Sequence, residues 1–144
     1  MTKPSAHTRS TYRHFLSIPT LWMDNDVYRH VNNVVYYSFF DTAVNHYLIV
    51  ENVLDIERSS VIGLVVETAC QYFAPIAFPD RVEAGLRVAK LGNSSVRYEV
   101  GIFRSGEQSA SAQGHFVHVY VDRATQRPTP LPEALRRALE KIQV

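Results

Sequence analysis

The sequence has a single cysteine, almost no net charge and no long apolar run, and each shortage excludes a class of protein. Because Cys70 is alone, the chain can form no internal disulfide and no cysteine-rich zinc site. Fifteen basic residues against fourteen acidic ones leave a formal charge of +1, which offers nucleic acid no basic face. The longest apolar run, Val61 to Val66, contains a glycine and is too short to span a bilayer.

The rest of the composition is that of an ordinary globular domain. The 144 residues are 46% hydrophobic and 20% charged, and a chain of this length buries about 70% of its unfolded surface. Residues 1–11 are polar and lack the apolar core of a signal peptide, so we expect a flexible lead-in there. We therefore predict one domain over residues 12–144 and a cytoplasmic location.

One segment, Asn33 to Val50, has the pattern of a long buried helix. It contains neither glycine nor proline, and Asn32 or Asn33 can cap its first turn. Apolar and aromatic residues cover nearly its whole circumference, which is typical of a helix that is buried on several sides. We therefore expect other parts of the chain to wrap around it.

The remaining patterns predict strands on both sides of this helix in the sequence. A first strand falls within Tyr12–Met23, where Pro19 interrupts the ladder or marks an edge. Four further strands are expected over residues 60–77, 80–91, 95–103 and 108–122, with turns at Gly92-Asn93 and Ser105-Gly106 and a terminal helix over residues 131–142. The predicted fold class is therefore α+β, a curved antiparallel sheet around a central helix.

Residues 24–33, Asp-Asn-Asp-Val-Tyr-Arg-His-Val-Asn-Asn, lie directly before the predicted helix. A helix N-terminus presents unpaired N–H groups and a partial positive charge of about half an elementary unit. Asp26 precedes that end by seven residues, so the loop can fold its carboxylate back toward the dipole. This arrangement suits attack on a polarised carbonyl, because the N–H groups stabilise the oxyanion while the acid attacks or activates water.

The pattern D-x-D-x-x-x-H-V-N-N followed by V-Y-Y-x-F-F-D resembles the hotdog-fold acyl-CoA thioesterases of the 4-hydroxybenzoyl-CoA thioesterase superfamily. The likeness continues through Tyr72-Phe73-Ala74-Pro75, Leu91 to Ser95 and Pro130-Leu131-Pro132, and so spans nearly the whole chain. It implies the hotdog fold and a homodimer, or a tetramer made of two such dimers. It also implies no metal and no cofactor, since coenzyme A is part of the acyl-CoA substrate.

The resemblance assigns roles to individual residues of the motif. Asp26 matches the catalytic acid of the family, and the backbone amide that polarises the thioester carbonyl falls at Asn33. His30 and Asn32 complete the H-V-N-N sequence, His30 with an orienting role and Asn32 next to the substrate. Arg29 departs from the pattern, because many relatives have glycine before this histidine; it can restrict the loop or reach the substrate.

Further residues are candidates for substrate binding. Tyr28 is an aromatic residue that can line an acyl pocket, and Ser95 lies in a segment that shares the resemblance. Arg97 is one of several basic residues that can contact the phosphates of coenzyme A. Glu67 interrupts an apolar strand, so it either faces solvent at the sheet edge or lines the site as a second carboxylate.

A metal site is not expected at the two histidines nearest to each other in the C-terminal half. His115 and His118 are three residues apart on a strand, so their rings point to opposite faces.

The predicted function is hydrolysis of an acyl-CoA thioester to free acid and coenzyme A. Two alternatives remain: a hotdog hydratase or dehydratase that uses His30 with Asp26, and an acyl-CoA-binding module without catalysis.

Overall fold

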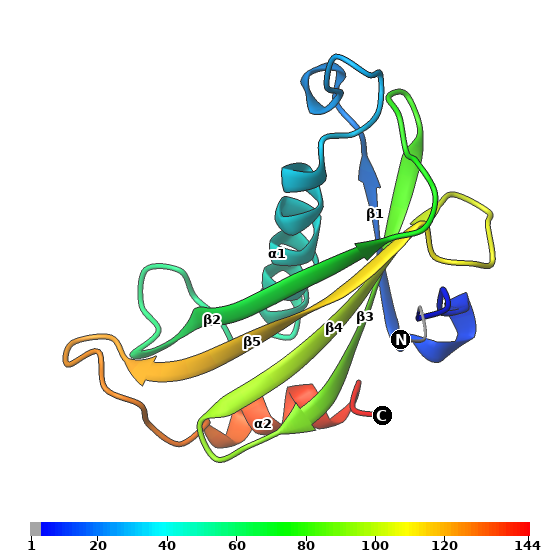
Figure 1. Ribbon diagram of the computed structural model, residues 1–144. Helices are drawn as coiled ribbons and strands as arrows, with labels where there is room; N and C mark the ends of the chain where they lie inside the picture. The colour runs from blue at the N-terminus through cyan, green and yellow to red at the C-terminus, as the bar shows by residue number, and fades with distance from the viewer. Residues whose placement is uncertain (1–3) are drawn as a thin grey trace.

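The computed structural model describes residues 4–144. Five strands and two α-helices follow one another along the chain (Figure 1). They are β1 (His14–Pro19), α1 (Asn33–Val50), β2 (Val61–Tyr72), β3 (Arg81–Leu91), β4 (Ser95–Arg104), β5 (Ala112–Asp122) and α2 (Glu133–Glu140). Short 3₁₀ turns occupy Arg9–Thr11 and Trp22–Asp24. Over residues 4–144, neither α-helix is long and apolar enough to cross a membrane.

All five strands form one antiparallel sheet in the order β1-β3-β4-β5-β2. Hairpin turns join β3 to β4 and β4 to β5, whereas β2 pairs with β5 rather than with β3, its successor in the chain. The sheet curves around one side of α1 (Figure 1). The predicted α+β hotdog architecture is therefore confirmed.

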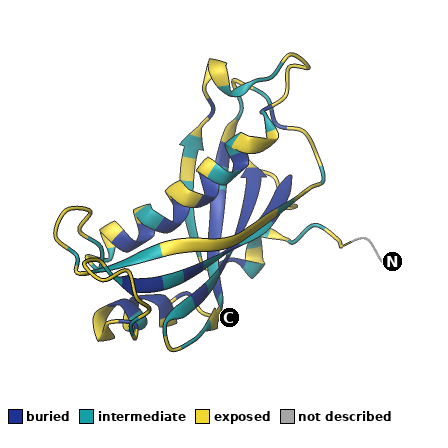
Figure 2. Ribbon diagram, turned by 60° about the vertical axis from the view of Figure 1, so that its left-hand side comes forward, coloured by how far each residue is buried: buried dark blue, intermediate teal, exposed yellow. Residues whose placement is uncertain are grey.

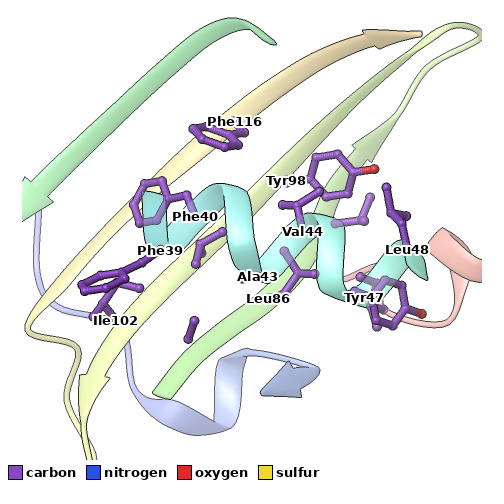
Figure 3. Close-up of a cluster of buried hydrophobic side chains, with 14 of the residues drawn as sticks. Phe39, Phe40, Ala43, Val44, Tyr47, Leu48, Leu86, Tyr98, Ile102 and Phe116 are labelled. Carbon is purple, nitrogen blue, oxygen red and sulfur yellow. The ribbon is translucent and has the colours of Figure 1, made fainter. Parts of the chain in front are cut away.

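Helix α1 begins and ends at the predicted residues, and the Asn32 side chain caps it by accepting a hydrogen bond from Val34 N at 3.2 Å. One face packs on the sheet, and its side chains meet those of β3, β4 and β5 (Figure 3). The buried residues of this face are Tyr36, Phe39, Phe40, Ala43, Val44, Tyr47 and Leu48.

The expectation that the helix is wrapped on several sides is met only in part. Val34, Ile49 and Val50 are exposed although they are apolar. Figure 2 shows the alternation of buried and exposed segments along the helix, with only one side against the sheet. The sheet ends at β2, so this chain by itself does not enclose the helix.

The ends of the chain lie against the sheet. Pro19, the last residue of β1, occupies the edge strand, where a missing N–H costs no ladder bond. Helix α2 is fixed to α1 by a hydrogen bond of 2.6 Å from Tyr47 Oη to the Ala138 carbonyl. In the lead-in, Arg9 N donates to the Gln108 carbonyl and the His7 carbonyl accepts from Ala110 N. Residues 1–3 of the predicted lead-in lie outside the described residues.

Strand β2 differs from the other long strands because it is exposed along most of its length (Figure 2). It pairs with β5 on one side only, and its register shifts at a bulge between Val65 and Glu67. Leu64, Val65 and Val66 expose 40–60% of their surface at this edge. An apolar edge strand of this length is a surface that proteins normally cover.

Candidate active site

The loop between β1 and α1 is held by its own polar side chains. Asp24 Oδ2 accepts a hydrogen bond from Leu21 N at 2.7 Å, and the Asp24 carbonyl accepts from Asn32 N at 2.8 Å. Asn25 Oδ1 accepts from Phe78 N at 3.0 Å, which ties the loop to the segment that follows β2. These bonds fix the start of α1 relative to the loop.

Asp26 organises the tight turn that leads to His30. Its Oδ1 accepts from Tyr28 N at 2.8 Å and from His30 N at 3.4 Å, while Asp26 N donates to the His30 carbonyl at 2.8 Å. Among residues 4–144, no cation lies within ion-pair distance of this carboxylate and no donor contacts its Oδ2. The second oxygen is therefore free for chemistry.

Arg29 adopts a backbone φ of 66° inside this turn. Glycine reaches the left-handed region without steric cost, whereas other L-residues are strained there. The glycine that the resemblance implies for this position would adopt the turn without that cost. The turn keeps its shape despite the arginine, because the Asp26 carbonyl accepts a hydrogen bond from Arg29 N at 3.0 Å.

The first turn of α1 leaves one backbone donor free. Val34 N is capped by Asn32 Oδ1 and Val35 N donates to the Asn32 carbonyl at 2.9 Å. In the described part of the chain, the Asn33 N–H has no acceptor. As the first N–H of an 18-residue helix, it lies at the positive end of the helix dipole.

Asp26, His30 and Asn33 line one cavity of about 450 Å³. Tyr36 of α1 also lines it, together with residues 72–75 at the end of β2 and just after it. Asp26 and the N-terminus of α1 therefore border the same opening. The sequence predicted that the loop between them would fold back in this way. Asn32, expected next to the substrate, is not among the residues that line this cavity, and its side chain caps α1 by accepting from Val34 N.

Tyr72 is a residue of this cavity to which the sequence analysis gave no site role. Its hydroxyl donates to the Asn33 carbonyl at 3.1 Å, and its ring meets that of Tyr36 edge-on at 5.0 Å. Burial raises the pKa of Tyr72, which keeps the hydroxyl protonated as a donor. The resemblance at Tyr72-Phe73-Ala74-Pro75 was the available signal, but it did not indicate that β2 ends beside the helix N-terminus.

A second cavity of about 440 Å³ adjoins Asp26 from the side of the loop. Trp22, Met23 and Arg29 line it together with Asn25 and Asp26. The predicted acyl-pocket residue Tyr28 points elsewhere, with 79% of its surface exposed, and lines neither cavity at Asp26.

Three other predicted substrate-binding residues lie away from these cavities. Glu67 accepts a hydrogen bond from His115 Nε2 at 2.8 Å if that nitrogen is protonated, on the sheet face opposite α1. Arg97 lies on the same outer face and donates to Glu99 Oε2 at 3.1 Å. Ser95 begins β4 at the far end of the sheet, and its carbonyl accepts from Gly92 N at 2.8 Å.

The two C-terminal histidines face opposite sides of β5, as predicted. His118 is buried beside Tyr98, with ring centroids 5.0 Å apart, whereas His115 lies on the outer face with Glu67. Burial lowers the pKa of His118 to about 4, so its ring is neutral. Within residues 4–144, no group of three metal-ligating side chains is close enough to hold an ion.

Comparisons with known proteins agree with this geometry. The family model described as the thioesterase-like superfamily matches residues 20–139. The PA5185 protein from Pseudomonas aeruginosa PAO1 is 57% identical over 96% of both chains, with a TM-score of 0.94. The PA2801 protein of Pseudomonas aeruginosa is 30% identical over 88% of this chain and 98% of its own, with a TM-score of 0.82.

A thioesterase from Thermus thermophilus, solved in complex with coenzyme A and zinc, is 29% identical over 92% of this chain and 95% of its own, with a TM-score of 0.73. No curated protein matches the chain. The matched family covers the loop of Asp26, α1 and all strands after it. The chain therefore belongs to the thioesterase-like superfamily, and it is a thioester hydrolase with the hotdog fold.

Proposed function

We propose that this enzyme hydrolyses an acyl-CoA thioester to the free acid and coenzyme A, with Asp26 and the Asn33 amide as the reacting groups. The observation that carries the proposal is the shared cavity, which brings a carboxylate with one free oxygen and a helix N-terminus together. The coenzyme A bound to the Thermus thermophilus thioesterase supports the choice of thioester. These two groups suffice for hydrolysis, so the reaction needs no metal or further cofactor.

The Asn33 amide and the Asp26 carboxylate have different roles in the proposed reaction. The Asn33 N–H donates to the thioester oxygen, where negative charge develops as the carbonyl carbon is attacked. In one route Asp26 Oδ2 attacks that carbon, the C–S bond breaks to release the coenzyme A thiolate, and water hydrolyses the resulting acyl anhydride. In the other, Oδ2 takes a proton from the attacking water and passes it to the departing thiolate. Oδ1 remains held by Tyr28 N in both. The His30 carbonyl accepts from Asp26 N, and Asn32 donates through its N–H to the Asp24 carbonyl while its Oδ1 accepts from Val34 N. These bonds hold the loop against the start of α1.

An acyl-CoA screen with a free-thiol assay tests the proposal. Acetyl-, octanoyl-, benzoyl- and 3-hydroxyoctanoyl-CoA are incubated with the purified protein. Thiol release is followed for all four, together with absorbance of the enoyl product that the 3-hydroxyacyl substrate alone can give by loss of water. We expect one thiol to be released for each molecule of free acid formed. Enoyl absorbance without thiol would instead identify a hydratase or dehydratase, and tight binding without turnover would identify a binding module.

We also propose that the enzyme is a homodimer joined through β2. The exposed apolar side chains of Leu64, Val65 and Val66 lie on an unpaired edge, and covering that edge with a second copy satisfies its backbone groups. Light scattering of the wild type and of Val66→Lys tests this, since a buried lysine at the seam should yield monomers. An unchanged mass would remove β2 from the interface.

Coenzyme A recognition remains a prediction at several positions. Arg29 borders the second cavity of Asp26, and Arg97, Ser95 and Glu67 lie on other parts of the surface. A substrate that reaches from the Asp26 cavity to any of these positions would have to cross the edge of the sheet. A rise in the KM for acyl-CoA with unchanged kcat in Arg97→Ala would support its contact with the phosphates.

A further inference from the structure

The loop between β1 and α1 places a second group of hydrogen-bond donors beside Asp26. This loop lies beyond the N-terminal end of α1 (Figure 1), and its cavity has a volume of about 440 Å³. Asp26 lines both this cavity and the one that contains Asn33. A thioester polarised by the Asn33 N–H therefore has the loop-side cavity available for one of the two groups on its carbonyl carbon.

Arg29 is an unpaired cation in the loop-side cavity. Within residues 4–144, its guanidinium forms no ion pair, although Asp26 is only three positions away. By contrast, Arg87 and Arg97 on the outer side of the sheet are both held by Glu99. A guanidinium is always charged, and its planar fork of N–H donors fits a carboxylate.

Arginine occupies this position at a conformational cost. The φ of Arg29 is 66°, in the left-handed region where glycine would be unstrained. Over the described residues, no ion pair of its side chain offsets that cost. Strained residues of this kind cluster at active sites and ligand-binding sites. The strain therefore favours a role for the Arg29 side chain toward a ligand.

Asn25 adds a second donor to the same cavity. Its Oδ1 accepts from Phe78 N at 3.0 Å, so the other end of the amide is the NH₂ group. No acceptor for this group lies within hydrogen-bond distance in the described part of the chain. Arg29 and Asn25 thus offer N–H donors to a ligand, and an ionised carboxylate is a group that only accepts.

The remaining walls of the loop-side cavity are apolar. They are formed by Trp22 and Met23, whose side chains are largely exposed. Large apolar side chains that gather at the surface mark binding sites more often than single ones do. The cavity is almost three times the roughly 150 Å³ that accepts benzene, so a short methylene chain and a terminal carboxylate fit into it.

The position of Arg29 favours the acyl group over the phosphates of coenzyme A. About thirteen bonds separate the thioester sulfur from the nearest phosphorus, slightly more than four extended residues or about 14 Å. Arg29 is in the same tight turn as Asp26, because Arg29 N donates to the Asp26 carbonyl at 3.0 Å. An anion held there lies within a few bonds of the reacting carbon, which an acyl group provides and an extended coenzyme A arm does not.

We propose that the loop-side cavity binds the acyl group, and that the substrates are acyl-CoA esters in which a short methylene chain ends in a carboxylate. Arg29 and Asn25 donate to that carboxylate. Trp22 and Met23 contact the methylene groups, and the thioester remains at Asp26. The guanidinium also offsets the repulsion between the carboxylate of Asp26 and that of the substrate. The inference rests on the proposed hydrolysis and names its substrate class.

A matched pair of substrates tests the recognition of the carboxylate. Adipoyl-CoA and 5-carbamoylpentanoyl-CoA have the same chain and differ only in a terminal carboxylate or amide. We expect a kcat/KM about tenfold higher for adipoyl-CoA in the wild type, the range of a hydrogen bond to a charged group, and no such preference in Arg29→Gln. Arg58→Gln is the matched control. It removes an exposed arginine of the loop after α1 that has no ion pair among residues 4–144, and it should keep the preference.

Two further variants distinguish recognition of charge from a purely structural role. Arg29→Glu should reverse the preference, so that 6-aminohexanoyl-CoA is hydrolysed faster than adipoyl-CoA. Asn25→Asp keeps an acceptor for Phe78 N and exchanges only the NH₂ group for an oxygen, so it should lower the preference for adipoyl-CoA several-fold. An unchanged order of the three substrates in both variants would contradict the proposal.

A binding measurement separates this inference from the hydrolysis on which it rests. In Asp26→Asn, calorimetry should show adipoyl-CoA binding about tenfold more tightly than its amide, and addition of Arg29→Gln should remove the difference. This result, together with no thiol release from any acyl-CoA by the wild type, would overturn the hydrolysis alone. Thiol release with equal kcat/KM for the matched pair would overturn carboxylate recognition alone. A loss of equal size for both substrates in Arg29→Gln would also overturn it and assign Arg29 to coenzyme A.

Discussion

The α1 side of the sheet and its outer side both carry acids and histidines, but these side chains have different hydrogen-bond partners on the two sides. On the outer side, Glu99 accepts hydrogen bonds from Arg87 at 2.9 Å and from Arg97 at 3.1 Å, and Glu67 contacts His115. On the α1 side, Asp26 has only backbone donors within bonding distance and His118 has an unpaired nitrogen.

The difference teaches which polar residues are available for chemistry. A carboxylate held between two guanidinium groups is already neutralised, and its pairing stabilises the fold. A carboxylate that accepts only from backbone N–H groups, such as Asp26, is not committed to an ion pair. The charges that pair with each other therefore lie on one side of the sheet, and the groups proposed to react lie on the other.

The largest expected difference between the two sides of the sheet is the loss of kcat on substitution of Asp26. Asp26→Asn removes the free oxygen as nucleophile or base, so kcat for acyl-CoA hydrolysis should fall by about 10²- to 10⁴-fold. Glu67→Gln, on the outer side, should change kcat less than about threefold, the range of a surface contact. The rate of thiol release at saturating substrate gives kcat for both variants. Equal losses of kcat would contradict a functional difference between the two sides of the sheet.

Substitutions on the outer side of the sheet should lower the free energy of unfolding rather than kcat. Burial alone would raise the pKa of Glu99, but hydrogen bonds from Arg87 and Arg97 outweigh it and leave the pKa below its ordinary value. Glu99→Gln leaves both arginines without a carboxylate and should lower the free energy of unfolding by about 2 kcal/mol. Urea denaturation at pH 7 measures the change; a fall in kcat without loss of stability would place Glu99 in the site.

Acid should weaken the fold through His118. Because burial lowers its pKa to about 4 from 6.5, the unfolded chain binds a proton between these values that the folded chain excludes. Stability is therefore lost as pH falls from about 6.5 toward 4, by about 2 kcal/mol per chain between pH 7 and pH 5.

His118→Phe should abolish this part of the pH dependence, and His115→Phe, its counterpart on the outer side, should retain it. Urea denaturation of the three proteins at pH 7 and pH 5 gives the differences. If His118→Phe loses as much stability as the wild type on acidification, the buried histidine is not the group that titrates.

The smallest expected effect concerns the strained turn at Asp26. Arg29→Gly removes the steric cost of a φ of 66°, so the free energy of unfolding should rise by roughly 1 kcal/mol. Arg29→Ala keeps a Cβ and should gain little. Thermal denaturation compares the two variants, and a lower midpoint for Arg29→Gly would mean that the arginine side chain itself stabilises the loop.

Much of the local structure followed from local patterns. The bounds of α1 match the prediction because a cap, an apolar run and the absence of glycine and proline act within a few residues of one another. The five strands formed in the five predicted segments, with β4 extending one residue past its predicted end, to Arg104. The meeting of Asp26 with the N-terminus of α1 was predictable because only seven residues separate them.

Other parts of the site depend on contacts between distant segments. Tyr72 reaches Asn33 across 39 positions because β2 pairs with β5, and no local pattern specifies that order. The outward direction of Glu67 and Arg97 likewise depends on which face of the sheet α1 covers. The incomplete wrapping of α1 could not be read from its apolar circumference, which is the same whether the cover is this chain or a second copy.

The sequence by itself determined the helix, its capped and electropositive start, and the acid placed seven residues before it, because short-range hydrogen bonds and periodicity encode these features. Only the tertiary structure decided that β2 is an exposed edge, that Tyr72 completes the cavity of Asp26, and that His118 is buried without a partner. Those features arise from the pairing of strands far apart in the chain, where topology rather than neighbouring residues sets the contacts.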